Sequence, residues 1–228
     1  MAKLLGDGVL IVWVDLKQEA RVEADRWYGE EHLPERVTHA GYLRSRRFHA
    51  VRASPMYMAM FEASTPMALA SEGYSRITSR INPRSHAMRN AFTRCIRSTH
   101  RRLACFGEGE GGVMVCARLK FDSAQQRGVF EAWAGSDFAA WLQSHGAVIS
   151  GHALAAAPEV RQHMDQFRET GHSDEWADGV ILAELGQDAD ADDRLMQMLS
   201  ASGLAAAGIE TNGVETGIYR AMVSFTAT

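Results

Sequence analysis

The chain has few cysteines and no long hydrophobic run, and each of these absences excludes a class of protein. Among its 228 residues are three cysteines, Cys95, Cys105 and Cys116, without CxxC spacing. An odd number in this pattern argues against a disulfide framework or a zinc site and predicts a reducing, cytoplasmic location. The longest apolar run near the start, residues 9–14, is far shorter than the roughly 18–20 residues that cross a membrane. No basic leader or small-residue cleavage site accompanies it, so we expect neither a signal peptide nor a membrane partner.

Motifs for nucleotide, nucleophile and metal sites are also missing. The sequence has no P-loop and no GxSxG motif. Residues 107–112, GEGEGG, formally match the dinucleotide pattern GxGxxG, but such a loop follows a strand and opens a helix, whereas these glycines precede a predicted strand. The glutamates between them would also repel a pyrophosphate, so we interpret the segment as a linker. The histidines lack the HxxxH or HxH spacing of a metal motif, and we expect neither a metal nor a cofactor.

Charge is divided unevenly between the two halves of the chain. Residues 1–106 hold 17 Lys and Arg against 10 Asp and Glu, whereas residues 107–228 hold 7 against 18. Opposite net charges favour packing of the two halves against each other. The overall net charge of −4 argues against non-specific nucleic-acid binding, and a hydrophobic content of 46% is enough for a folded core.

The predicted elements follow the same order on both sides of the linker. Runs rich in β-branched and aromatic residues predict strands, and apolar residues three and four apart predict helices. In the first half we expect strands at 8–16, 41–52, 55–63 and 92–106, and helices at 19–39 and 65–74. In the second half we expect strands at 113–121, 147–157, 179–185 and 213–225, helices at 123–144 and 192–202, and a long loop at 158–176. Pro34 should end or kink the first helix, because proline has no amide donor.

Each half therefore has the order β-α-β-β-α-β of a ferredoxin-like unit. Such a unit carries its helices on one face of the sheet and leaves the other face bare. Two units can bury their bare faces together. The prediction is an α+β protein with two domains, 1–106 and 107–228, whose sheets form an α+β barrel within one chain.

A short motif in the first half resembles a known family. Residues 27–36, WYGEEHLPER, are similar to the W-Y-x-x-E-H-x-P-E motif of the dimeric α+β-barrel proteins, in the broad group that includes the EthD-like proteins. The resemblance continues through Gly41-Tyr42 and through residues 55–62, PMYMAMFE, and it covers roughly residues 8–75.

The resemblance implies a pocket between the sheet and the helices of each unit or within the barrel. Relatives in the superfamily include cofactor-independent monooxygenases, isomerases, cyclases, dehydratases and decarboxylases of aromatic or polyketide-like compounds, and other relatives bind haem. The second half opens similarly at residues 130–133, FEAW, but the His-x-Pro of the motif does not follow. If the motif residues are catalytic, only the first half would be active and the second would be a degenerate unit.

His32 is the first candidate for catalysis. Tyr28 and His32 are four residues apart and share a helix face, and Trp27 and Glu31 form the neighbouring pair. Aromatic rings beside an imidazole and a carboxylate can form a pocket edge with a positioned base, and imidazole passes protons in either direction near neutral pH. The alternative is a structural role, in which His32 caps the helix end before Pro34 by bonding the last carbonyls.

Two predicted strands supply further candidates. Arg47 and His49 share one strand face, where they could hold a substrate carboxylate or phenolate. The alternative for both is a contact with the acidic half. On the next strand, Tyr57 and Phe61 flank the small Ala59, which leaves room for a ligand. The methionines on the other face of that strand are interpreted as core.

A basic stretch ends the first half. It consists of His86, Arg89, Arg94, Arg97, His100, Arg101 and Arg102. No aromatic platform or nucleic-acid motif accompanies it, so we interpret it as the partner of the acidic half.

The leading hypothesis is a cofactor-independent enzyme of lyase or isomerase type that acts by general acid/base catalysis on a small aromatic or polyketide-like molecule. The predicted catalytic residues are His32, Tyr28 and Tyr57, and the predicted substrate contacts are Trp27, Glu31, Arg47, His49 and Phe61. A monooxygenase would need a substrate that reacts directly with oxygen. The alternatives are a non-catalytic EthD-like accessory or small-ligand-binding protein and a haem protein with one axial histidine. The chain could also form a homodimer.

Overall fold

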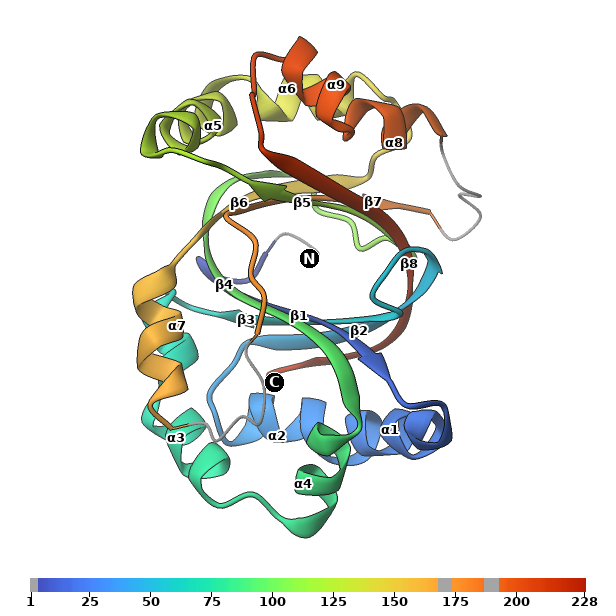
Figure 1. The fold of residues 1–228 in the computed structure, drawn as a ribbon, viewed down its shortest axis with the longest axis vertical. Coiled ribbons are helices and arrows are strands. Elements are labelled where there is room, and N and C mark those ends of the chain that lie inside the picture. The colour runs from blue at the N-terminus through green and yellow to red at the C-terminus, as the bar shows by residue number, and fades with distance from the viewer. Residues whose placement is uncertain (1–3, 168–173, 187–192) are drawn as a thin grey trace.

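The strands predicted from the sequence close into a barrel. The computed structural model describes residues 4–167, 174–186 and 193–228. Within these residues, eight strands follow the order β1-β3-β2-β8-β5-β7-β6-β4 around a closed barrel (Figure 1). Their bounds are β1 Gly8–Leu16, β2 Arg44–Arg52, β3 Tyr57–Ala63, β4 Phe92–Phe106, β5 Val113–Lys120, β6 Ser150–Ala156, β7 Gly179–Leu185 and β8 Gly213–Thr226.

The barrel consists of two ferredoxin-like units. The strands of the first half lie in the order β4-β1-β3-β2, and those of the second half repeat it as β8-β5-β7-β6. The units meet where β2 pairs with β8 and where β4 pairs with β6, both antiparallel. Because each outer strand of one unit pairs with the other unit, the barrel formed by the described strands has no free edge. The prediction of two tandem units that form a barrel within one chain is confirmed.

Helices cover the outside of the barrel, at the bottom of Figure 1 for the first unit and at the top for the second, except that α7 (Pro158–Asp165) of the second half lies beside α3 (Glu72–Ser79). In the first unit they are η1 Gln18–Ala20, α1 Arg21–Trp27, η2 Tyr28–His32, α2 Leu33–Thr38, η3 Met67–Ala70, α3 Glu72–Ser79 and α4 Pro83–Asn90. In the second unit they are α5 Ala124–Ser136, α6 Phe138–Gln143, α7 Pro158–Asp165, α8 Asp193–Met198 and α9 Ala201–Ala206. The last predicted helix, 192–202, is thus divided into α8 and α9, and its first residue lies outside the described residues.

One helix of the second half packs on the first unit. α7 occupies the start of the stretch predicted as a long loop, so that prediction is wrong for residues 158–165, and residues 168–173 lie outside the described residues. Val160 and Met164, four residues apart on α7, are buried in one core with Leu69 of the first unit. The second half therefore helps to cover the helical layer of the first.

The helix that carries the motif continues through Pro34. A wide π turn, η2, joins α1 to α2 directly before the proline. Pro34 is the second residue of α2, and a helix tolerates proline in its first turn because no donor is missed there. The proline thus does not end the helix, which runs to Thr38, and the irregularity expected at this point takes the form of the π turn.

The interior of the barrel holds a buried ionic network as well as apolar side chains. Arg44 donates two hydrogen bonds to Glu62, with Nε–Oε1 and Nη2–Oε2 distances of 2.7 Å and 3.0 Å. Arg46 donates to Glu184 at 2.9 Å and 3.1 Å, and His152 lies 3.4 Å from the same carboxylate. Burial disfavours the charge on Glu184, but His152 and Arg46 lower its pKa to about 2. Because Arg46 and Glu184 belong to different units, this pair connects the two halves through the barrel.

Ion pairs also join the basic stretch to the acidic half. These pairs are Arg94–Glu175 at 3.3 Å, Arg97–Asp165 at 2.7 Å and Arg101–Glu131 at 2.6 Å. They confirm the predicted contact between oppositely charged halves. Arg102 instead pairs with Asp7 of its own half.

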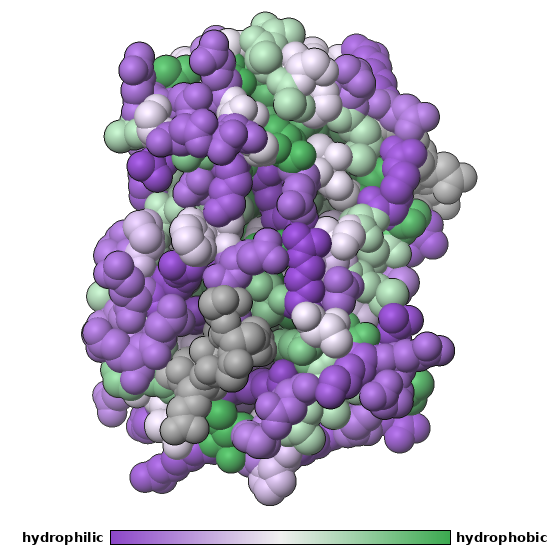
Figure 2. Space-filling view, viewed as in Figure 1, coloured by the Kyte–Doolittle hydropathy of each residue, from purple (hydrophilic) through white to green (hydrophobic). Residues whose placement is uncertain are grey.

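The face of the molecule seen in Figure 2 is predominantly polar. Hydrophilic residues cover most of both units on the face shown in Figure 2. None of the helices in the described parts of the chain combines the length and the apolar character that crossing a membrane requires. The pocket that contains His32 lies between the first unit's sheet and its helices.

Candidate active site

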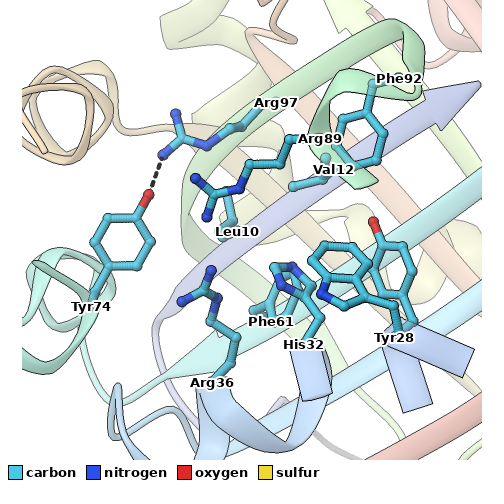
Figure 3. Close-up of a pocket in the computed structure, with 11 residues that line it drawn as sticks. Leu10, Val12, Tyr28, His32, Arg36, Phe61, Tyr74, Arg89, Phe92 and Arg97 are labelled. Atoms are coloured by element: carbon cyan, nitrogen blue, oxygen red, sulfur yellow. Dashed lines mark hydrogen bonds between the residues drawn. The ribbon is translucent and has the colours of Figure 1, made fainter. Parts of the chain in front are cut away.

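A pocket of about 50 Å³ lies between the outer face of the first unit's sheet and the helices that cover it (Figure 3). Its sheet-side wall is apolar and consists of Leu10, Val12, Phe61 and Phe92. The remaining lining residues carry polar groups or form the helix-side wall, and they are Trp27, Tyr28, His32, Arg36, Tyr74, Arg89 and Arg97. The guanidinium groups gather on the side of Tyr74, away from Tyr28.

The motif helix places three of its polar side chains in this pocket. Tyr28, His32 and Arg36 follow one another at intervals of four residues, so they lie on the same helix face, which is turned to the sheet. Tyr28 and Arg36 are buried, and His32 is half-buried. The pocket-facing side of the motif thus combines a phenol, an imidazole and a guanidinium.

The imidazole of His32 is held among aromatic rings. It stacks on Trp27 with 4.2 Å between ring centroids and an interplanar angle of 26°. The edges of Tyr28 and Phe61 approach it with centroid distances of 5.1 Å and 5.9 Å. Because the helix continues to Thr38, His32 does not lie at a helix end, and the alternative role as a C-terminal cap is wrong. The structure brings together four of the predicted site residues at this pocket: Trp27, Tyr28, His32 and Phe61.

Glu31 lies outside the pocket lining and positions Trp27 indirectly. Trp27 Nε1 donates to Ser85 Oγ at 2.9 Å, and Ser85 Oγ donates to Glu31 Oε1 at 2.6 Å. Asn82 donates to the same oxygen at 2.6 Å. Although burial disfavours the charge, the hydrogen bonds from Ser85 and Asn82 hold the pKa of Glu31 below its ordinary value. Glu31 therefore connects the motif helix to α4. It supports the indole of Trp27 through Ser85 and does not line the cavity.

Arg47, Tyr57 and His49 also lie outside the pocket lining. Arg47 is buried between two rings, with its guanidinium carbon 4.0 Å from the centroid of Tyr28 and 4.5 Å from that of Tyr57. Its charge is paired with Asp25 at 2.8 Å, within the first half rather than with the acidic half. His49 is exposed, with its ring centroid 5.2 Å from that of Tyr57. Arg47 and Tyr57 support Tyr28 from behind.

Tyr28 is a hydrogen-bond donor at neutral pH. Burial raises its pKa to about 12, although the Arg47 guanidinium opposes this effect. The phenol therefore keeps its proton well above the physiological range. It can donate to a bound group but cannot act as a base there.

The sequence interpretation did not assign the other polar lining residues, Arg36, Tyr74, Arg89 and Arg97, to the site. Arg36 could have been found, because it continues the four-residue series of Tyr28 and His32. Arg89 and Arg97 belong to the basic stretch that was interpreted as an ionic interface. Arg97 serves both purposes, because it pairs with Asp165 and also lines the pocket.

Arg97 is fixed in position by its partners. Its Nη1 lies 2.7 Å from Asp165, and its Nη2 donates to the hydroxyl of Tyr74 at 3.3 Å. Burial disfavours its charge, but Tyr74 and Asp165 raise its pKa above the ordinary value. Arg97 is therefore charged at neutral pH.

The pocket admits little more than a few water molecules in this arrangement, since each water needs about 10–15 Å³ when volume is measured in this way. Rigid aromatic rings form the wall around His32, but the opposite wall consists of long arginine side chains. A guest with a ring would have to displace the far ends of those arginines.

The corresponding space in the second unit is filled by apolar side chains. Phe130 and Trp133 of α5, Phe138 of α6 and Leu195 of α8 are buried in one core against the second unit's strands. Among the residues with described positions, no group of three or more His, Cys, Asp or Glu side chains could hold a metal ion.

The chain is similar in fold to several solved structures. No family model matches the sequence, and no curated protein matches it. An anthrone oxidase-like protein is 11% identical, with a TM-score of 0.65 and coverage of 96% of this chain and 92% of that one. A proposed monooxygenase from Lactobacillus acidophilus is 8% identical, with a TM-score of 0.58 and coverage of 96% of each chain. A proposed chlorite dismutase is 10% identical, with a TM-score of 0.53 and coverage of 98% of this chain and 96% of that one.

These likenesses extend over nearly the whole chain and show the fold. The protein has the ferredoxin-like, dimeric-type α+β barrel, here formed within a single chain. The narrower resemblance to EthD-like proteins rests on the motif alone.

Proposed function

We propose that the protein is a cofactor-independent enzyme that moves a proton on a small aromatic or polyketide-like molecule, in a reaction of lyase or isomerase type. The observation that carries the proposal is the position of His32 at a pocket walled by Trp27, Tyr28 and Phe61. An imidazole in such surroundings can take a proton from a bound carbon acid or return it at another atom. The aromatic walls favour a flat apolar guest.

The other motif residues support that role in different ways. Tyr28, which keeps its proton, would donate a hydrogen bond to the oxygen on which negative charge develops. Trp27 sets the plane of the imidazole by stacking on it, and Ser85 holds the indole by its nitrogen. Arg47 and Tyr57 pack behind Tyr28 and would act only through it.

A second candidate reaction is oxygenation without a cofactor. It is favoured by the solved structures of similar fold, which include an anthrone oxidase-like protein and a proposed monooxygenase. Deprotonation by His32 would be the first step of either reaction, because an electron-rich carbanion is also the form of a substrate that oxygen attacks directly. Consumption of dissolved oxygen, measured with an electrode during turnover, distinguishes the two.

The alternatives kept from the sequence have less support. Pockets that hold drug-sized ligands usually measure roughly 300 Å³ or more. The cavity beside His32 measures about 50 Å³, so a guest with one ring must enlarge it, and haem, which is much larger, would require separation of the helix from the sheet. A non-catalytic accessory role would give no reason for an imidazole directed at a cavity.

The test is proton transfer on a panel of carbon-acidic aromatic ketones, with phenylpyruvate as the first probe. We expect the protein to accelerate keto–enol exchange, followed by absorbance and by deuterium incorporation. His32→Gln should lower the rate by about 100-fold or more, the usual contribution of a positioned acid/base group. The matched control is His86→Gln, which changes an exposed histidine on α4. Equal rates for His32→Gln and the unaltered protein would reject His32 as the proton-transfer residue.

A further inference from the structure

The pocket contains a buried guanidinium, that of Arg36, whose Nη1 has no hydrogen-bond partner among the described residues. We propose that its ligand bears a carboxylate and that Arg36 receives this group; the inference rests on the proposed function in taking this pocket as the substrate site. The ligand class is then an aromatic or otherwise flat carboxylate, and its charged end lies among the arginines while its apolar end faces His32.

The first observation is the state of Arg36. This residue is 4% exposed, and its Nη1 has no hydrogen-bond partner among the described residues. Its guanidinium lies over the ring of Tyr74, with 5.4 Å from carbon to centroid. The adjacent acid, Glu35, attracts Arg36 electrostatically but forms no hydrogen bond or ion pair with it in the described part of the chain, and it lines a different hollow with His39. A buried cation without an acceptor is costly, and such groups in native proteins call for an explanation.

The second observation is that the surrounding wall is cationic as a whole. Arg89 and Arg97 line the same pocket as Arg36, and no aspartate or glutamate lies among the described lining residues. The guanidinium groups of all three point to the same region of the cavity (Figure 3). Asp165 already balances Arg97 at 2.7 Å, whereas the Nη1 of Arg36 has no acceptor among the described residues.

The shape of the pocket favours a carboxylate over other anions. A guanidinium is a planar fork that matches the two oxygens of a carboxylate with parallel hydrogen bonds. The cavity, at about 50 Å³, is narrow, and apart from Arg97 its sheet-side wall offers apolar side chains such as those of Leu10 and Phe61. A tetrahedral anion such as phosphate would leave oxygens against that wall without donors.

The experiment measures binding rather than turnover, so a catalytically inactive protein still gives an answer. The probes are three pairs of equal shape and different charge: formate and formamide, acetate and acetamide, benzoate and benzamide, with inorganic phosphate as a separate arm. The smallest pairs test the cavity at its present volume, and the largest tests entry of a ring. We expect the acid of at least one pair to bind about tenfold or more tightly than its amide by calorimetry or ligand-observed NMR.

Substitution of Arg36 tests whether this residue is the receptor. Arg36→Met should reduce the affinity of the preferred acid to that of its amide. Because it removes an uncompensated buried charge, it should also leave the melting temperature of the ligand-free protein unchanged or raised. Arg36→Lys, which keeps the charge without the planar fork, should retain part of the preference. The control is Arg26→Met, which changes an exposed arginine on α1, the first part of the helix that carries the motif.

Several results would overturn the proposal. Acids and amides that bind alike in all three pairs, or fail to bind in all three, would show that the pocket does not select negative charge. A preference for acids that persists in Arg36→Met would move the receptor to another residue. Tighter binding of phosphate than of any carboxylate would replace the ligand class. If Arg36→Met does not fold, Arg36→Lys decides, and undiminished affinity in that variant contradicts the role given to the planar fork.

Discussion

At the scale of single residues, the period of the helix directs the side chains of the motif to two different surroundings, the cavity and α4. His32 and Arg36 face the cavity, whereas Glu31 is directed at α4. Residues that are adjacent in sequence thus serve different neighbours. The connection between the two sets is Trp27, whose ring stacks on His32 and whose nitrogen is held by Ser85.

Removal of the Ser85 hydroxyl tests this connection. In Ser85→Ala the buried indole N–H of Trp27 loses its acceptor and Glu31 loses a donor. An unsatisfied buried donor costs about 1–3 kcal/mol, so the free energy of unfolding should fall by that amount. Urea denaturation provides the measurement. The control is Ser79→Ala, which changes an exposed serine at the end of α3 and should alter the free energy of unfolding by less than about 0.5 kcal/mol. An equally small effect of Ser85→Ala would show that the indole is held by packing alone.

The sequence predicted the aromatic wall of the site better than its charges. Trp27, Tyr28, His32 and Phe61 follow from helix and strand periodicity, which local sequence expresses directly. Arg47 was assigned to the correct strand face, but its partner Asp25 depends on the distance between helix and sheet, which periodicity does not contain. Charged side chains are long, and their partners are determined only by the tertiary packing.

At the scale of elements, the motif helix is a composite whose irregular turn lies beside the catalytic candidate. The π turn η2 spans Tyr28–His32 and is followed by the proline of α2. Such turns are rare and occur frequently at functional sites. Proline chemistry predicted an irregularity here but not its form, because Pro34 falls in the first turn of α2, where its missing donor carries no penalty.

Two helical glycines in the first unit should respond in opposite ways to alanine. A Cβ at Gly29, within η2, would have no neighbour within 4 Å, so Gly29→Ala should stabilise the protein by about 0.5–1 kcal/mol through helix propensity. A Cβ at Gly73, in α3, would collide with the carbonyl oxygen of His39. Gly73→Ala should therefore destabilise the protein, because helix and turn must separate. Thermal unfolding of both variants compares them, and destabilisation by Gly29→Ala would mean that the π turn does not tolerate a side chain.

At the scale of the whole molecule, the order of elements was sufficient to predict the barrel. The β-α-β-β-α-β order in each half leaves one bare sheet face per unit, and burial of two such faces requires the units to meet. The sequence did not reveal the ionic network inside the barrel. Glu184, the partner of Arg46, lies 138 residues away in the sequence, and its position depends on the register across the barrel.

The buried pair between Arg46 and Glu184 should make the stability of the barrel sensitive to acid. The folded pKa of Glu184, about 2, lies below its ordinary value of 4.5, because His152 and Arg46 outweigh the effect of burial. A lowered pKa contributes stability that is complete above pH 4.5 and is lost as the pH falls toward 2. Glu184→Gln should remove this contribution and leave buried Arg46 with the more distant Glu62, at 3.6 Å and already paired with Arg44, as its carboxylate neighbour, at a cost of about 3–5 kcal/mol. Asp193→Asn provides the matched control, since Asp193 also pairs across the units, with Arg52, but on the exposed surface.

Urea denaturation between pH 3 and 7 should show a reduced and flatter stability profile for Glu184→Gln only. A profile that falls as steeply toward acid as that of the unaltered protein would assign the acid sensitivity to other carboxylates.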